Sequence, residues 1–321
     1  MEMHLLDYSR QVHYFWALLP EIVLALWAML VLMVDVFQKG NRSEPSRPII
    51  PWLSLAGLVL TALANAYLML RVAETAPAGL VVVDQFRVFA NFIFLLSGAM
   101  ALFVSMGYLD RKGINRGEFH VLVLFAVLGM MLMAASRDLM MMFVALEVMS
   151  VAVYVLVGFD RLDPRSSEAS LKYFLLGAFS SAFFLYGVAL VFGATGSTNL
   201  AVIGPQVAGA LQARNFMLLV GAAMLMVVLG FKVAAVPFHV WTPDAYEGAP
   251  TPVTALMSTG VKAAAFAAFI RVFGVAFAGM YEVWAQIGFW LAALTMVIAN
   301  LVALTEGSLK RMLAYSSIAH A

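Results

Sequence analysis

The sequence predicts an all-α, polytopic membrane helix bundle. Of its 321 residues, 64% are hydrophobic and only 12% are charged, whereas a soluble domain is about half apolar and about a quarter charged. The apolar runs are about 20 residues or longer and show no period-two alternation, which favours helices over the strands of a barrel. Helices also satisfy their own backbone hydrogen bonds, as a segment in lipid must.

The composition excludes several kinds of chemistry from this chain. It contains no Cys, so thiolate iron–sulfur clusters, zinc thiolate sites and disulfides are ruled out. A net charge of +1 gives no electrostatic reason to expect nucleic-acid binding. The sequence has neither a phosphate-binding P-loop nor a dinucleotide-binding Gly fingerprint. We therefore expect the chain itself to bind no cofactor.

Five apolar runs in the first half of the chain predict five membrane spans. The first run is too long for a signal-peptide core and no small-residue cleavage site follows it, so we expect a retained span. The predicted spans are residues 14–37, 52–70, 86–109, 119–135 and 139–159.

A sixth span is expected to reach about residue 192, with Ser166 or Ser167 as its N-cap. The loop that follows predicts a short surface helix near residues 205–211. A seventh span begins near residue 215 and should be interrupted near Pro237, because proline removes a backbone donor and clashes with the preceding turn.

Two further spans and the start of a tenth complete the chain. They are residues 252–273, residues 281–304 and the run that begins at residue 308. The tenth run stops at Ala321, short of the roughly 20 residues needed to cross a bilayer. We therefore expect the sequence to be a fragment, with the rest of the membrane domain missing.

Lys and Arg residues in the short loops predict the orientation of the chain. With alternate crossings, the richer side receives Lys39, Arg42, Arg47, Arg111, Lys112, Arg116, Arg161, Arg165, Lys310 and Arg311. The poorer side receives mainly Arg10, Arg71, Arg87, Arg137, Arg214 and Arg271. Cytoplasmic loops carry the excess of positive charge. The N-terminus is therefore expected outside the cytoplasm and the loop at residues 241–251 inside it.

Three charged residues lie well inside predicted spans: Glu147, Lys232 and Lys262. An isolated lysine in the middle of a membrane costs about 2.5–3.5 kcal/mol, and such residues usually mark ion or proton pathways. Lys232 also precedes the helix-breaking Pro237. The sequence thus predicts a proton or ion path centred on Lys232, with a lysine that merely extends to the membrane interface as the alternative.

Glu147 and Lys232 have opposite charges and could form a pair. At an effective dielectric constant of about 20, a contact at about 4 Å is worth about 4 kcal/mol. A partner of this strength that comes and goes would change the proton affinity of the lysine enough for uptake and release. The alternative is a static pair that only joins two helices.

Lys172 and His239 are weaker candidates for the same path. Lys172 lies near the start of the sixth span and could instead extend to the cytoplasmic surface. His239 follows Lys232 by seven residues, which is one face of an unbroken helix, and imidazole titrates near neutral pH. A satisfied polar residue at the helix break is the alternative for His239. Small residues of the sixth span are expected to serve helix packing: Gly177, Ser180 and Ser181.

Residues 230–252 form the most specific motif of the chain, with the sequence GFKVAAVPFHVWTPDAYEGAPTP. This motif closely resembles the antiporter-like membrane subunits of respiratory complex I, the bacterial NADH-quinone oxidoreductase. The likeness covers essentially the whole chain. Its supporting segments are residues 19–21, 159–160, 166–174 and 310–317. Lys262 favours the subunit N branch of that family, because the sister subunits tend to carry His there.

The resemblance implies two inverted five-helix repeats, each with one broken helix, behind an N-terminal three-helix segment. The expected divisions are residues 1–117 for that segment, 118–277 for the complete first repeat and 278–321 for the start of the second. The resemblance also implies roles for the buried charges. Glu147 would be the partner carboxylate of the central Lys232, and Lys172 and Lys262 would be links in a polar axis.

The function implied by the resemblance is proton translocation driven by electron transfer from NADH to quinone. FMN, the iron–sulfur clusters and the quinone would be bound by other subunits. The implied partners are the other membrane subunits of the complex and the lipid of a bacterial inner membrane, with no nucleic acid. A subunit of a multisubunit sodium/proton antiporter and a purely structural membrane subunit are the alternatives.

Overall fold

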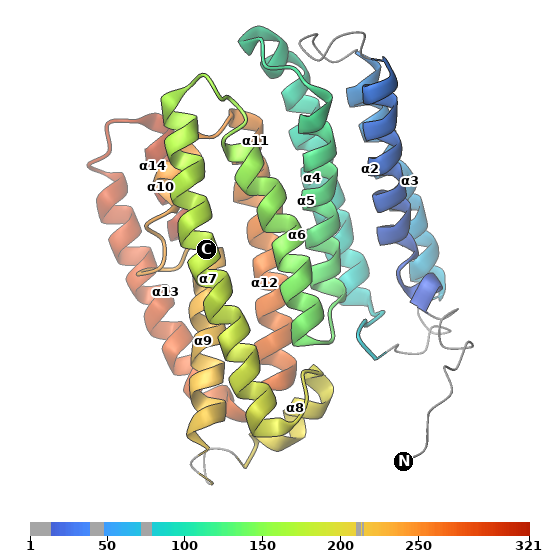
Figure 1. Ribbon diagram of the computed structural model, residues 1–321. Coiled ribbons are helices and arrows are strands. Elements are labelled where there is room, and N and C mark those ends of the chain that lie inside the picture. Colours follow the sequence, from blue (N-terminus) through green and yellow to red (C-terminus); the bar gives the residue numbers. More distant parts are fainter. Residues whose placement is uncertain (1–13, 39–47, 72–78, 210–212, 214) are drawn as a thin grey trace.

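The computed structural model describes residues 14–38, 48–71, 79–209, 213 and 215–321. In these ranges the chain is helical apart from turns, short connections and two isolated β-bridges. Nine helices of the described part are long and apolar enough to cross a membrane, and Figure 1 shows them packed side by side. The predicted all-α membrane bundle is confirmed.

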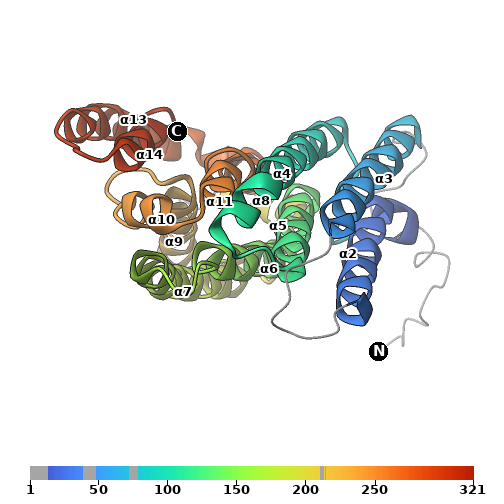
Figure 2. The same cartoon turned by 90° about the horizontal axis from the view of Figure 1, so that it is seen from above.

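The first three spans are α2 (Leu19–Gln38), α3 (Ile49–Arg71) and α4 (Gln85–Lys112). Seen from above, α2 and α3 lie at one end of the molecule, opposite the C-terminal helices (Figure 2). Asp84 caps α4 by accepting a hydrogen bond from the backbone N–H of Arg87 at 2.8 Å. This cap satisfies one of the N–H groups that have no partner at a helix start.

Two tightly packed helices, α5 (Gly117–Ala135) and α6 (Leu139–Val157), form the centre of the described bundle. Gly129 allows their close approach, because a Cβ at this position would lie only 2.4 Å from the backbone nitrogen of Met149. Backbone atoms cannot yield to such an overlap. The contact therefore fixes the depth of α6, the helix that carries Glu147.

Asp163 caps the next helix, α7 (Pro164–Thr195), by accepting a hydrogen bond from a backbone N–H of the first turn. The predicted cap at Ser166 or Ser167 is wrong. Ser166 lies inside the helix and donates its hydroxyl to the carbonyl of Val157 at 2.7 Å. The helix begins earlier than expected because aspartate followed by proline is a strong start signal.

The short helix α8 (Leu200–Val207) begins earlier than the predicted range of residues 205–211. Asn199 sets its start by accepting a hydrogen bond from the backbone N–H of Ala201 at 3.0 Å. The end of the predicted range, residues 210–211, lies outside the described residues. The position of the asparagine cap, rather than that of the internal proline, decides where this helix starts.

The seventh span is broken, as predicted, into α9 (Phe216–Val233) and α10 (Thr242–Gly248). The break begins at Ala234, whose φ of 64° ends α9 in a left-handed conformation. It therefore comes before Pro237. The lysine expected deep in this span lies in the last turn of its first half.

The eighth span follows one helical path with two π-helical turns. Its parts are α11 (Thr251–Leu256), η1 (Met257–Val261), α12 (Lys262–Arg271) and η2 (Val272–Ala276). The chain continues through the 3₁₀ turn η3 (Ala278–Met280), α13 (Tyr281–Ala303) and α14 (Leu309–Ala319). The π turn η1 widens the helix directly before Lys262, and such turns occur often at functional sites.

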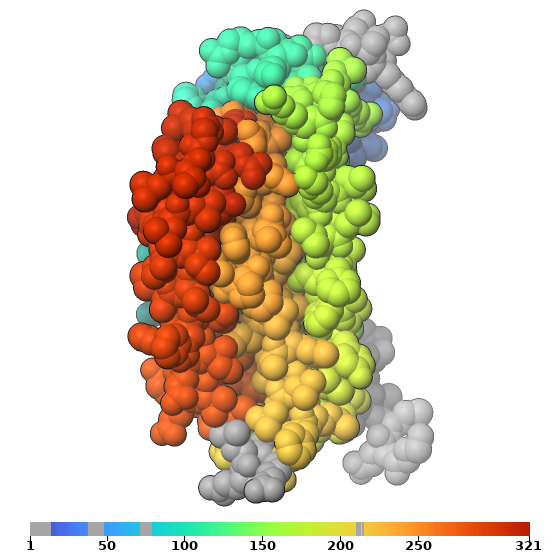
Figure 3. All heavy atoms as spheres, turned by 90° about the vertical axis from the view of Figure 1, so that its left-hand side faces the viewer, coloured from blue at the N-terminus to red at the C-terminus, as the bar shows by residue number. Residues whose placement is uncertain are grey.

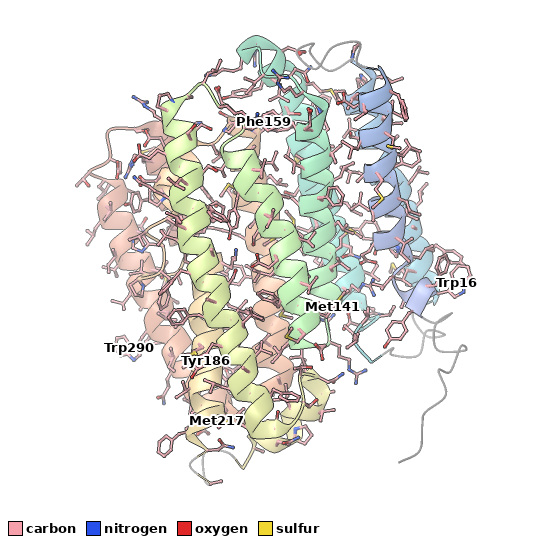
Figure 4. The ribbon with its side chains drawn as sticks, in the orientation of Figure 1. Trp16, Met141, Phe159, Tyr186, Met217 and Trp290 are labelled. Atoms are coloured by element: carbon pink, nitrogen blue, oxygen red, sulfur yellow. The ribbon has the colours of Figure 1, made fainter. Side chains whose placement is uncertain are left out.

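The outer surface of the bundle is apolar, as expected for contact with lipid. Trp290 projects from α13 away from the bundle, and Trp16 lies at the opposite edge (Figure 4). Figure 3 shows α13 and α14 in red beside the orange segment that contains α10, with α7 in light green. In the most apolar stretch of the span at residues 278–303, only 11% of the residues are buried. This span therefore offers a large apolar surface.

Candidate functional site

Lys232 lies at the end of α9, and only 1% of it is exposed. Its Nζ donates hydrogen bonds to Oγ of Ser150 at 2.7 Å and to the hydroxyl oxygen of Tyr154 at 3.4 Å. Nζ also lies 5.5 Å from the centre of the Tyr154 ring, within the range of a cation–π attraction. The buried lysine is thus held by neutral groups of α6.

Glu147 lies on the same helix as these hydroxyls, and its carboxylate accepts a short hydrogen bond from Oγ of Ser181 on α7. Glu147 and Lys232 are both described, and they form no ion pair within 4.0 Å. Instead, Ser150 follows Glu147 by three residues on α6 and occupies the contact with the lysine. The carboxylate still acts on the ammonium electrostatically, so the two charges interact across a gap.

At the break after α9, backbone groups that lose their helical partners form other hydrogen bonds. The backbone N–H of Ala235 donates to the carbonyl of Gly230 at 2.8 Å. Nε1 of Trp241 donates to the carbonyl of Phe231 at 3.0 Å, and the N–H of Val236 donates to Oγ1 of Thr295 on α13 at 2.9 Å. A helix end can be buried in an apolar bundle only when its groups are satisfied in this way.

Lys262 is the second buried lysine, with 7% of its surface exposed. Its Nζ donates to the carbonyl of Ser317 on α14 at 2.5 Å, and no acidic side chain of the described residues forms an ion pair with it. The predicted polar axis would need further groups to connect Lys262 with Lys232, because within the described residues the hydrogen-bond partners of Lys232 are Ser150 and Tyr154 and that of Lys262 is Ser317.

Lys172 lies at the surface, with 48% of its side chain exposed, and forms ion pairs with Glu168 at 2.7 Å and Asp244 at 2.9 Å. It therefore extends to the edge of the bundle. Asp244 also accepts a hydrogen bond from Arg311 at 2.8 Å. Burial alone would raise the pKa of Asp244, but the hydrogen bonds from the two cations outweigh it and hold the pKa below its ordinary value of 3.8.

His239 lies in the connection between α9 and α10, where it is half-buried. Because α9 ends at Val233, the seven-residue spacing from Lys232 does not place both side chains on one helix face. The imidazole ring instead lies edge-on to Tyr315, with 6.3 Å between the ring centres. The structure does not bring His239 into contact with Lys232.

Sequence reasoning missed the groups that contact Lys232 and Glu147 directly. Ser150 and Tyr154 follow Glu147 by three and seven residues, and this spacing on a helix could have identified them as one face. Ser181 was expected to serve packing, but it also donates a hydrogen bond to Glu147. Gly177 does serve packing, since a Cβ there would lie 1.9 Å from the Tyr154 hydroxyl.

Two arginines that the orientation argument counted on the poorer side of the membrane form ion pairs at the ends of spans. Arg87 is fully buried and donates to Glu21 at 2.7 Å. Arg271 donates two hydrogen bonds to Asp84, at 2.5 and 2.6 Å. Burial alone would raise the pKa of Asp84, but Arg271 outweighs this effect and lowers it. The first pair joins α4 to α2, and the second joins the start of α4 to the eighth span.

A family model matches the part of the chain that contains all five predicted site residues. Residues 136–321 match the NADH:quinone oxidoreductase/Mrp antiporter transmembrane family. This match covers more than half of the 321 residues. The chain belongs to this family. Among its members, the NADH-quinone oxidoreductase subunit N of Trichlorobacter lovleyi is 47% identical over 304 residues, which are 95% of this chain and 61% of the relative.

Solved structures of the antiporter family share this fold. Respiratory complex I from Thermus thermophilus contains a chain that is 39% identical, with a TM-score of 0.70 over 94% of this chain and 62% of that one. A chain of the Mrp complex from Dietzia is 23% identical, with a TM-score of 0.74 over 95% of this chain and 57% of that one. The Mrp likeness shows the fold alone. This chain spans about three fifths of the length of the relatives that it matches.

Proposed function

We propose that the chain acts as a proton-translocating membrane subunit of an NADH-quinone oxidoreductase, with Lys232 as the central proton-binding residue. The observation that carries this proposal is a lysine buried at the break of a membrane helix and contacted by hydroxyl groups rather than by a counter-ion. The similarity to subunit N of Trichlorobacter lovleyi supports the choice of complex.

The surroundings of Lys232 bring its charged and neutral forms close in free energy. Burying a lysine at the membrane centre costs about 2.5–3.5 kcal/mol, and each hydrogen bond from a charged group contributes about 1.5–3 kcal/mol. Moving one charge against 100 mV takes about 2.3 kcal/mol. These terms have similar size, so a change at the nearby Glu147 is sufficient to switch the lysine between its two states.

The other candidate residues take roles that follow their positions. Lys262, buried beside α14, is proposed as the next proton-binding residue. Lys172 is proposed to be the member of the proton path at the surface, where its ion pair with Asp244 joins α7 to α10. His239 is proposed as a relay at the break, because its imidazole is half-buried and can exchange protons near neutral pH.

The redox chemistry is proposed to lie in other subunits. A chain without Cys offers no thiolates for iron–sulfur clusters, so FMN, these clusters and the quinone would be held elsewhere. The proposed partners are sister antiporter-like subunits and small membrane subunits. The proposed location is a bacterial inner membrane, with the N-terminus in the periplasm as the positive-inside rule predicts. A sodium/proton antiporter subunit has less support, because the likeness to the Mrp complex is limited to the fold.

The test is proton pumping by the assembled complex in inverted membrane vesicles energised with NADH. Lys232→Ala and Glu147→Gln should abolish the pH gradient while the complex still assembles. Lys112→Ala is the matched control, because Lys112 is half exposed and its ion pair within the described part of the chain is a long, 3.9 Å contact with Asp160. Normal pumping by an assembled Lys232→Ala complex would remove this residue from the mechanism.

A further inference from the structure

The contacts of Lys232 come from two buried hydroxyls that the proposed function does not yet use. Ser150 and Tyr154 are 1% and 5% exposed, and both accept hydrogen bonds from Nζ. They lie four residues apart on α6 and so face the same side of that helix. The lysine therefore meets a pair of neutral oxygens before it meets any carboxylate.

Tyr154 is held firmly in its position. Its ring packs edge-on against Tyr173 of α7, with 4.6 Å between the ring centres. Its hydroxyl enters the space that Gly177 leaves open, where a Cβ would approach to 1.9 Å. A side chain fixed by ring packing and by a missing methyl group has little freedom to move with the lysine.

We propose that Ser150 and Tyr154 are positioning residues that keep Lys232 able to both hold and release a proton, by giving its Nζ hydroxyl partners in place of a direct contact with the Glu147 carboxylate. This inference rests on the proposed function. A carboxylate only accepts hydrogen bonds, so direct contact with it would favour the charged ammonium alone. A hydroxyl accepts from the ammonium and, after rotation, donates to the neutral amine. The two hydroxyls can therefore satisfy both states of the lysine.

Other ionisable groups near Lys232 are few in the described part of the chain. On α6, Glu147 acts on the ammonium electrostatically. On α7, Tyr173 lies behind Tyr154. On α12, Lys262 is bound to α14. A change in the pH response after removal of a hydroxyl can therefore be assigned to the Lys232 surroundings.

The test is the pH profile of NADH-driven proton pumping by the assembled complex. In Ser150→Ala the ammonium loses its shortest acceptor, so the alkaline limb should move to lower pH by about one unit. Ser150→Thr keeps a hydroxyl and should restore the wild-type profile. Ser180→Ala is the matched control, because Ser180 is buried on α7 and its hydroxyl has no hydrogen-bond partner within the described residues.

A second variant pair keeps the test decisive if Ser150→Ala fails to assemble. Tyr154→Phe keeps the ring and removes the weaker contact, so it should shift the profile in the same direction by a smaller amount. Tyr173→Phe is its control, since the Tyr173 hydroxyl is buried without a hydrogen-bond partner in the described part.

The outcomes separate the inference from the proposed function. Pumping that survives Lys232→Ala overturns the function and the inference together. Loss of pumping in Lys232→Ala, with wild-type profiles in Ser150→Ala and Tyr154→Phe, overturns only the positioning role. Where Ser150→Ala does not assemble, an unshifted profile in Tyr154→Phe alone has the same meaning. A downward shift that Ser150→Thr or the control variants do not show supports the positioning role, whereas an upward shift in Ser150→Ala overturns it.

Discussion

Asp244 of α10 accepts a hydrogen bond from Arg311 of α14, with 2.8 Å between Oδ1 and Nη1. Its other oxygen accepts from Lys172 of α7 at 2.9 Å. The short second half of the broken helix is therefore joined to both of its neighbours by one carboxylate. These three side chains line a surface cleft of about 360 Å³. Charges at the edge of the bundle thus hold α10 against α7 and α14.

Acidification should release α10 from its neighbours. The folded pKa of Asp244 lies below 3.8, so its contribution to stability is fully present above that value and is lost as the pH falls through the lower folded pKa. Amide hydrogen exchange in α10, corrected for intrinsic rates, should therefore increase at pH below about 4. Asp244→Asn should show the faster exchange already at pH 7, with no further change in acid. Equal protection of α10 in both proteins would contradict this prediction.

Gly129→Ala should weaken the packing of α5 on α6. The added Cβ would lie 2.4 Å from the backbone nitrogen of Met149, and overpacking of this kind costs about 1–3 kcal/mol. The melting temperature of the purified protein should fall by several degrees. Gly107→Ala is the control, since nothing lies within 4 Å of its added Cβ and alanine favours a helix interior. A lower melting temperature for Gly107→Ala would point to a general cost of substitution instead.

Arg271→Gln should loosen the contact between the eighth span and the start of α4. It removes both charged hydrogen bonds to Asp84, and because Asp84 is one-third exposed we expect a loss of about 1–2 kcal/mol. A double-mutant cycle with Asp84→Asn, followed by thermal denaturation, measures the coupling. The double variant should be little less stable than Arg271→Gln alone, whereas additive losses would show that the two side chains act separately.

Lys262→Met should reduce proton pumping far more than Lys172→Met. Lys262 is buried with one carbonyl acceptor, whereas Lys172 is half exposed between two carboxylates. Methionine keeps most of the length of the side chain and removes the charge and the hydrogen-bond donors. We expect at least a tenfold lower initial rate of vesicle acidification for Lys262→Met and no more than a twofold change for Lys172→Met. The reverse order would place the proton path along the surface cleft.

A reporter inserted after Gly113 should be active only when it requires the cytoplasm. Gly113 ends α4 with φ of 68°, and its surroundings are open within 4 Å, so an insertion there should leave the fold intact. Gly196, with φ of 67° at the end of α7, is equally open and lies on the other side of the membrane by the order of the spans. A reporter at Gly196 should require the periplasm. Identical behaviour at both positions would overturn the predicted topology.

Much of the fold could be predicted because its main signals are local. Apolar length alone locates the spans, and Pro237 marks the region of the broken helix. The errors lie at helix ends, as at Asp163 and Asn199, where a single capping hydrogen bond decides between neighbouring residues. The ion pairs of Arg87 and Arg271 could not be predicted for another reason. Their partners, Glu21 and Asp84, are far away in the sequence.

In the candidate site, too, some residues could be predicted from the sequence and others could not. The buried lysine and the carboxylate of the fifth span can be identified from the sequence, because a charge within an apolar run is conspicuous. The hydroxyls between them are not, since Ser150 and Tyr154 are ordinary residues of an apolar helix until α9 is packed against α6.

By itself, the sequence determined the class of the protein, the number and order of its described spans and the presence of a lysine beside a helix break. Each of these depends on hydrophobicity or backbone geometry over a few turns. Only the tertiary structure decided that Lys232 contacts hydroxyls, that Glu147 is held by Ser181 and that Lys172 lies at the surface. Such contacts depend on the depth and rotation of packed helices, and at Gly129 and Gly177 the helices approach so closely that no Cβ would fit.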